Sequence, residues 1–190
     1  MPDSRNNPEL ANYHLLVSRI DELTDGITNR FAAQIACRAG CSDCCRHITV
    51  FPVEAAALAS ALALLPGESR RHLEEGGDMP PEGPCPLLCD DRCRAYADRP
   101  IICRTHGLPL LTAIDGEQRV DYCPENFRDM SSLPGDGVMN LDTINRTLVA
   151  INARFVQETG DPRFRGTERF SIADIVRLAL GQPFPGQVGG

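Results

Sequence analysis

Apolar residues recur at helical spacing near the start of the chain. Their intervals alternate between three and four positions, which places them on one face of a helix and predicts a long helix over residues 8–36. A second helix is expected to begin at Pro52, which suits a first helical turn, and to stop at Pro66 and Gly67. Residues 76–86, rich in Gly and Pro, predict a loop.

The second half of the chain predicts a hairpin followed by two helices. Residues 108–114 and 117–122 flank Asp115-Gly116, a dipeptide that favours the type I′ turn of a β-hairpin. Helical spacing returns over 141–155, with Asn140 as the expected cap. A last helix, 172–180, should begin at the capping pair Ser171 and Asp174. The predicted fold is mainly α with a small β-hairpin, and metal holds cysteine-rich loops between the helices.

This order divides the chain into four expected parts. They are an N-terminal helix (1–36), a cysteine-cluster metal-binding domain (37–130), a C-terminal helical segment (131–181) and a tail expected to be disordered (182–190).

Composition supports a metal-reinforced fold. Aromatic residues make up only 5% of the 190 residues and Trp is absent, so large core side chains are scarce, whereas there are nine cysteines. The opening residues lack the pattern of a secretory signal, and the longest apolar stretch, 55–65, is well short of the roughly 18 residues that span a membrane. We therefore expect a cytoplasmic protein without a membrane partner, whose thiols stay reduced and bind metal rather than form disulfides.

Charge narrows the choice of function. The net charge of −7 argues against general nucleic-acid binding, because phosphates repel an acidic surface. All 19 basic residues are Arg, which excludes Schiff-base chemistry and the lysine of a phosphate-binding loop.

Four cysteines crowd into nine residues, as Cys37-x3-Cys41-x2-Cys44-Cys45. A short loop can turn such thiols toward one centre, as zinc or an iron-sulfur cluster requires. Neighbouring side chains usually diverge, so Cys44 and Cys45 either serve different metals or reach one centre through a bent loop. The spacing of the first three also matches that of radical S-adenosylmethionine enzymes, but the chain shows too few strands for their partial barrel.

A second group of motifs completes a recognisable order. Pro84-Cys85-Pro86 is followed by Cys93-x-x-Tyr96 and then by Arg99-Pro100-x-x-Cys103-Arg104. Together with the first cluster, these motifs resemble the zinc- or iron-chelating cysteine-cluster family (YkgJ-like, CxxCxxCC-type) from Cys37 to about Phe127.

The resemblance implies a set of metal-facing thiols and leaves Cys89 without a counterpart. Eight thiols would fill two tetrahedral sites, or one cluster with several thiols left over. Zinc is the expected metal, with iron or a 4Fe-4S cluster as the alternative. The implied ligands are Cys37, Cys41, Cys44, Cys45, Cys85, Cys93, Cys103 and Cys123.

Other residues near the thiols are candidates for supporting roles. His47 and His106 could complete a coordination shell, although surface or supporting positions are the simpler interpretation. Tyr96 and Phe127 are expected in the core. Four arginines next to cysteines could offset thiolate charge; they are Arg46, Arg94, Arg99 and Arg104.

The leading hypothesis is a metal-binding protein with a structural or interaction role, whose protein partner the sequence does not identify. The alternative is an iron-sulfur enzyme that modifies a protein or small molecule, with methyltransferase-like use of S-adenosylmethionine; a branch of the resembled family includes flagellin lysine methylases. A redox-sensing thiol switch ranks lower, because ligated thiols sense poorly unless metal is released.

Overall fold

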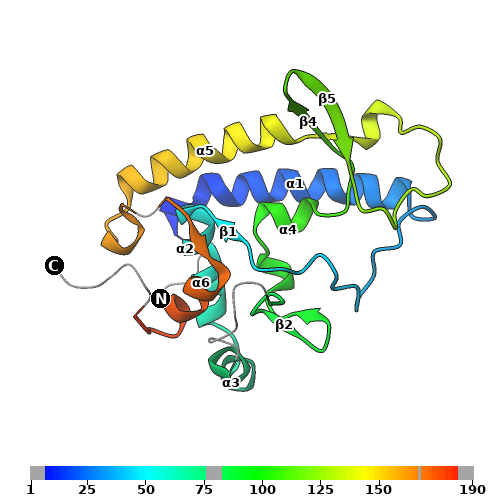
Figure 1. Cartoon of the computed structure of the whole chain (residues 1–190). Helices are drawn as coiled ribbons and strands as arrows, with labels where there is room; N and C mark the ends of the chain where they lie inside the picture. Colours follow the sequence, from blue (N-terminus) through cyan, green and yellow to red (C-terminus); the bar gives the residue numbers. More distant parts are fainter. Residues whose placement is uncertain (1–6, 76–82, 167, 184–190) are drawn as a thin grey trace.

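The structure, a computed structural model, describes residues 7–75, 83–166 and 168–183. Helices dominate these residues and the strands are short, which confirms the predicted fold class. In Figure 1, α1 and α5 run side by side, and α2 packs with α6 on one side of them. The helices are α1 (Ala11–Arg30), α2 (Pro52–Ala63), α3 (Gly67–Glu75), α4 (Ile101–Thr105), α5 (Leu141–Glu158) and α6 (Ile172–Ala179).

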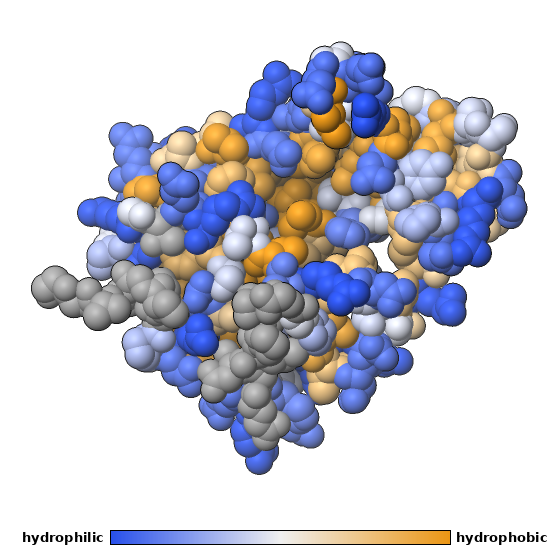
Figure 2. Space-filling view, in the orientation of Figure 1, coloured by the Kyte–Doolittle hydropathy of each residue, from blue (hydrophilic) through white to orange (hydrophobic). Residues whose placement is uncertain are grey.

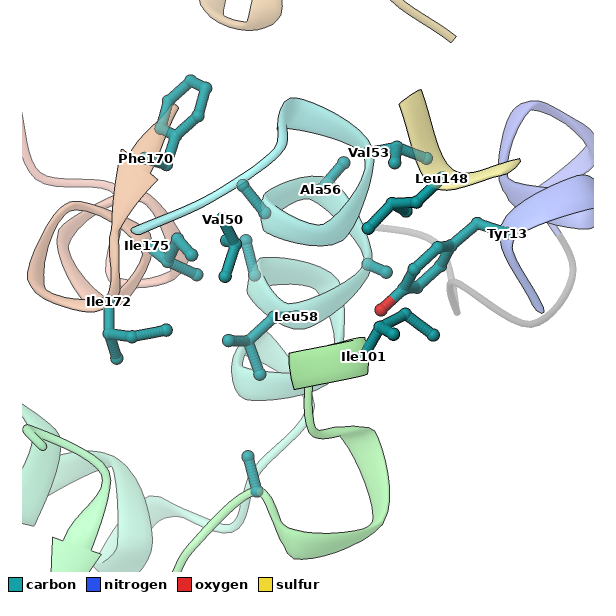
Figure 3. Close-up of a cluster of buried hydrophobic side chains, with 14 of the residues drawn as sticks. Tyr13, Val50, Val53, Ala56, Leu58, Ile101, Leu148, Phe170, Ile172 and Ile175 are labelled. Carbon is teal, nitrogen blue, oxygen red and sulfur yellow. The ribbon is translucent and has the colours of Figure 1, made fainter. Parts of the chain in front are cut away.

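Helix α2 is the centre of the hydrophobic core. Residues 52–59 are all buried, and four of them are alanines. Side chains from the first helix, the cysteine-rich segment and the C-terminal helices meet around it in one core. Figure 3 shows Phe170, Ile172 and Ile175 on one side of α2, and Tyr13, Ile101 and Leu148 on the opposite side.

Three small sheets accompany the helices, and two of them join segments that are distant in sequence. Strand β1 (Thr49–Val50) pairs with β7 (Phe170–Ser171) and ties the end of the first cysteine loop to the start of α6. The hairpin of β4 (Leu110–Ile114) and β5 (Glu117–Asp121) projects beyond the helices (Figure 1). Strand β6 (Met139–Asn140) adds to β4 in parallel, and β2 (Leu88–Cys89) pairs with β3 (Arg92–Cys93).

The local turn and cap signals are confirmed. Asp115 and Gly116 have φ angles of 53° and 81°, as a type I′ turn requires. The Asn140 side chain accepts the Thr143 N–H at 2.8 Å and starts α5. Ser171 and Asp174 cap each other's backbone N–H at the start of α6.

The predicted end of the first helix is wrong, because α1 stops at Arg30 rather than at residue 36. The next residues form a turn, in which the Gln34 N–H donates to the Phe31 carbonyl. The Gln34 carbonyl then accepts the Phe127 N–H at 2.7 Å. This backbone therefore bonds to the segment after β5 instead of continuing the helix.

Two further elements depart from the sequence predictions. Helix α3 was not expected, and the segment after Cys85 was expected only as one of the cysteine-rich loops between helices. Instead β2 and β3 form a tight hairpin, in which Asp90 and Asp91 both adopt left-handed backbone angles (φ 48° and 56°). Most of the predicted loop at 76–86 and of the predicted disordered tail at 182–190 lies outside the described residues.

The surface of the described residues is mixed. In Figure 2, apolar side chains show in the middle of the visible face, among charged and polar side chains. Within the part of the chain that is described, none of the helices is both long and apolar enough to cross a bilayer.

Candidate metal centre

All nine cysteines have free thiols and come from several segments of the described chain. Four belong to the loop between α1 and β1, and the remainder come from segments much further along. The loop carries Cys37, Cys41, Cys44 and Cys45; Cys85 precedes β2, Cys89 lies in β2, Cys93 in β3 and Cys103 in α4, and Cys123 follows β5.

One set of thiols, here called the outer group, consists of Cys37, Cys41, Cys44 and Cys123. The first three are exposed and Cys123 is half-buried. Partial burial raises the pKa of Cys37, and the charges of Cys123, Cys41 and Cys44 raise it further, so these sulfur atoms are neighbours. The loop bends where the Cys41 N–H donates to the Arg38 carbonyl at 3.0 Å.

Gly107 and Asn126 bring Cys37 against Cys123. A Cβ atom on Gly107 would lie 3.3 Å from the Cys37 sulfur and 3.4 Å from the Cys123 Cβ, and the φ of +83° also favours glycine. The buried Asn126 side chain donates to the Gly107 carbonyl at 2.7 Å and to the Cys37 sulfur at 3.4 Å. Its oxygen accepts the Ala36 N–H at 2.8 Å. One amide therefore joins three segments at the outer group.

The other set, here called the inner group, consists of Cys45, Cys85, Cys93 and Cys103. All four are partly buried. Burial raises the pKa of Cys103 to about 12, with further contributions from the Cys85, Cys93 and Cys45 charges. Burial likewise raises the pKa of Cys85 to about 11, and there the Cys93 and Cys45 charges add to it. The Cys85 N–H also donates to the Cys45 carbonyl at 3.0 Å, which joins the first cluster to the second.

In the inner group, backbone amides and one arginine counteract part of the rise in thiol pKa that burial causes. Burial raises the pKa of Cys85 and Cys93, while N–H groups of Leu87 and Ala95 donate to these two sulfurs and lower it. The Arg99 charge also lowers the pKa of Cys93, and it acts on Cys45 and Cys103 as well. These groups favour thiolates, the form that binds metal.

The four flanking arginines do not act alike. The Arg99 charge lowers the pKa of inner thiols, and its guanidinium carbon lies 3.6 Å from the centre of the Tyr96 ring. The expected core position of Tyr96 is wrong, since 64% of that residue is exposed. Arg94 donates to Cys89 at 2.6 Å, and Arg46 donates to the backbone carbonyl of Asp43. Phe127 is buried, as predicted.

Arg104 anchors α4 instead of facing the thiols. Its side chain, 8% exposed, donates to both Asp21 oxygens at 2.7 and 2.8 Å. It also donates to the carbonyl oxygens of Arg99 and Ala97. The residue after Cys103 therefore fixes α4 against α1.

A buried carboxylate fixes the other end of α4. Glu54, 3% exposed, accepts the N–H of Phe51 at 3.1 Å and that of Ile101 at 3.0 Å, so it joins the first turns of α2 and α4. Burial raises its pKa, and the two N–H groups work against that shift. Cys103 thus sits on a short helix held at both ends.

The adjacent pair Cys44-Cys45 contributes one thiol to each group. The Cys44 charge raises the pKa of Cys37 in the outer group. The Cys45 charge instead raises the pKa of Cys85 and Cys103 in the inner group. Each of these two thiols also shifts the pKa of the other, so the groups adjoin.

The chemistry of the site suits a soft cation. Eight neighbouring thiols match the preference of zinc and iron for sulfur ligands. Three buried nitrogens beside the cysteines, His47 Nε2, Arg94 Nε and Arg99 Nε, have no hydrogen-bond partner. Among the residues described, however, no three His, Cys, Asp or Glu side chains are already arranged to hold an ion. Coordination would require the thiols to turn toward a common point.

Residues outside the predicted set prove important for the geometry. The cysteine-bearing segments are held in place by Asn126, Gly107 and Glu54. Asp21 also contributes, because it pairs with Arg104, which lies 83 residues further along the chain. No sequence motif marks these residues, because each acts through contacts between distant segments. His106 is exposed at the end of α4.

A mainly helical chain with eight thiols in two adjoining groups has the character of a cysteine-rich chelating domain. Residues 36–124 match the family model CxxCxxCC, described as "Putative zinc- or iron-chelating domain". This match confirms the resemblance recognised from the motifs. A search of curated proteins and a search of solved structures each gave no match.

Proposed function

We propose that the chain binds zinc at two four-thiol centres and that the metal holds its cysteine-rich half together, in a structural or interaction role. The observation that carries this proposal is the partition of the eight family-type thiols into the outer group and the inner group. Each has the four sulfur ligands of a tetrahedral zinc site. Iron suits the same ligands, and zinc is favoured for protein purified in air.

The outer loop has few other supports. Most of residues 32–47 are exposed or half-buried, and the loop contributes little to the hydrophobic core. Four thiolates joined to one ion would connect this loop to Cys123, and a second set would connect it to β3 and α4. Structural zinc supplies about 10–16 kcal/mol in small modules, which is comparable with the stability of a whole domain.

Both charge and compartment bear on the proposal. A tetrathiolate zinc site carries a formal charge of −2, and the Arg99 guanidinium near the inner group would offset part of it. Free thiols persist in a reducing environment, so we place the protein in the cytoplasm. An interaction role implies a protein partner.

Metal content per chain tests the proposal. The protein is purified anaerobically and in air, and zinc, iron and inorganic sulfide are measured together with the absorption spectrum. We expect two zinc ions per chain, a colourless solution and no sulfide. Less than one atom of zinc plus iron per chain in both preparations would refute metal binding, whereas brown protein with sulfide that bleaches in air would favour the iron-sulfur enzyme.

Serine variants test the ligand sets. Cys41→Ser should lose the ion of the outer group and Cys85→Ser that of the inner group, each retaining the other ion. Cys89→Ser is the matched control, because the same substitution is made in the same region on a thiol outside both groups.

A further inference from the structure

The two centres of the proposed function differ in what surrounds them. We infer that the outer group is an exchangeable site for a thiophilic divalent cation, open to incoming ligands, while the inner group holds its ion permanently. This inference rests on the proposed function, since it requires that both groups bind metal.

Exposure is the first difference. Three of the four outer thiols, Cys37, Cys41 and Cys44, are exposed, whereas every inner thiol is partly buried. Zinc exchange proceeds when an incoming ligand expands the coordination shell. A small thiol or chelator can approach the outer sulfurs from solvent, but it would have to displace protein around Cys85 and Cys103.

Anchoring is the second difference. Three inner thiols sit on β3, on α4 and beside β2, and α4 is fixed by Glu54 at its start and by Arg104 to Asp21. The fourth, Cys45, lies on the loop before β1, where its carbonyl accepts the Cys85 N–H at 3.0 Å. Three outer thiols sit on a loop and Cys123 lies two residues after β5; Asn126 joins these segments, and Ser42 donates from the loop to Asp91 at 2.7 Å. Opening the outer group therefore leaves both anchors of α4 in place.

Charge compensation is the third difference. The Arg99 charge lowers the pKa of three inner thiols. Its buried Nε–H has no hydrogen-bond partner, so this donor is available to a thiolate. The groups acting on Cys37 and Cys44 are Asn126, a backbone N–H and neighbouring cysteines, none of which carries positive charge. Four thiolates bound to one ion are thus better compensated in the inner group.

Cys44 of the outer group and Cys45 of the inner group are adjacent in the chain and shift each other's pKa, so the outer ion would lie next to the permanently held one. This arrangement suits a domain that keeps its fold while it takes up and gives away a second ion. The chemical class of the exchanged ligand is a divalent, thiolate-seeking cation such as Zn²⁺.

Release kinetics test the inference. The full chain, loaded with Zn²⁺ under anaerobic reducing conditions, is mixed with the chromogenic chelator 4-(2-pyridylazo)resorcinol, and zinc transfer is followed by absorbance. We expect two phases of equal amplitude whose rates differ at least tenfold. Cys41→Ser should lack the fast phase and keep the slow one, and Cys89→Ser should keep both.

A second variant covers the case in which Cys41→Ser does not fold. Arg99→Gln should accelerate the slow phase several-fold and leave the fast phase unchanged. Two bound ions released in a single phase, a fast phase that survives in Cys41→Ser, or an Arg99→Gln effect on the fast phase alone would overturn the inference while leaving metal binding intact. A chain that binds less than one ion would instead refute the proposed function.

Discussion

Asn126→Asp is the sharpest probe of how the outer group is held. The substitution keeps the oxygen that accepts the Ala36 N–H at 2.8 Å. A second oxygen takes the place of the side-chain nitrogen. That nitrogen donates to the Gly107 carbonyl at 2.7 Å and to the Cys37 sulfur at 3.4 Å. Two donated hydrogen bonds are lost, and a charged oxygen faces two acceptors in a position that is 1% exposed.

The expected cost follows from these contacts. A lost hydrogen bond that leaves a buried partner unsatisfied costs about 1–3 kcal/mol. Because water reaches Gly107 and Cys37 in part, we take the lower part of that range for each bond and expect a total of about 3 kcal/mol. For a domain of this size, that loss lowers the melting temperature by roughly 6–12 °C.

The assay compares Asn126→Asp with Asn145→Asp at equal zinc loading. Asn145 is exposed on α5, so the control makes the same chemical change and should stay within about 0.5 kcal/mol of the parent. Urea unfolding gives the free energies, and chelator kinetics should show a faster fast phase in Asn126→Asp alone. Equal stabilities for the two variants would refute the role assigned to Asn126.

Three further outcomes are expected. Cys89→Ser should retain the metal content and melting temperature of the parent, because this thiol is bound by Arg94 outside both groups. Arg104→Lys should lose about 2 kcal/mol of stability, since a lysine cannot reach Asp21 and two carbonyls together. The raised pKa of Glu54 means that its carboxyl binds a proton more readily when folded than its unfolded pKa of about 4.3 implies. Its contribution to stability is therefore complete below about pH 4.3 and is lost as pH rises through the folded pKa, so Glu54→Gln should gain melting temperature relative to the parent over that rise.

Each outcome has a contrary result. Metal loss in Cys89→Ser would make that thiol a ninth ligand. For Arg104→Lys the control is Arg154→Lys, whose arginine forms an exposed pair with Glu158, and equal losses in the two would remove the case for an anchor. A temperature difference between Glu54→Gln and parent that is constant with pH would show that Glu54 has no raised pKa.

Local chemistry decided what the sequence predicted correctly. The Asp115-Gly116 turn, the Asn140 cap and the Ser171 capping box each depend on residues within about three positions, so their geometry is fixed by neighbours in the chain. The crowding of Cys37 to Cys45 is likewise visible in the sequence and indicates metal chemistry by itself.

Contacts between distant segments decided the rest. Helix α1 ends early because the Gln34 carbonyl bonds to the backbone of Phe127, ninety-odd residues away. Arg104 lies next to a cysteine in sequence, yet it pairs with Asp21 in the fold. In the same way, the motifs alone indicated eight candidate thiols, and the packing of the loop, β3, α4 and the segment after β5 determined which thiols are neighbours. Spacing records only separation along the chain, whereas metal coordination depends on separation in space.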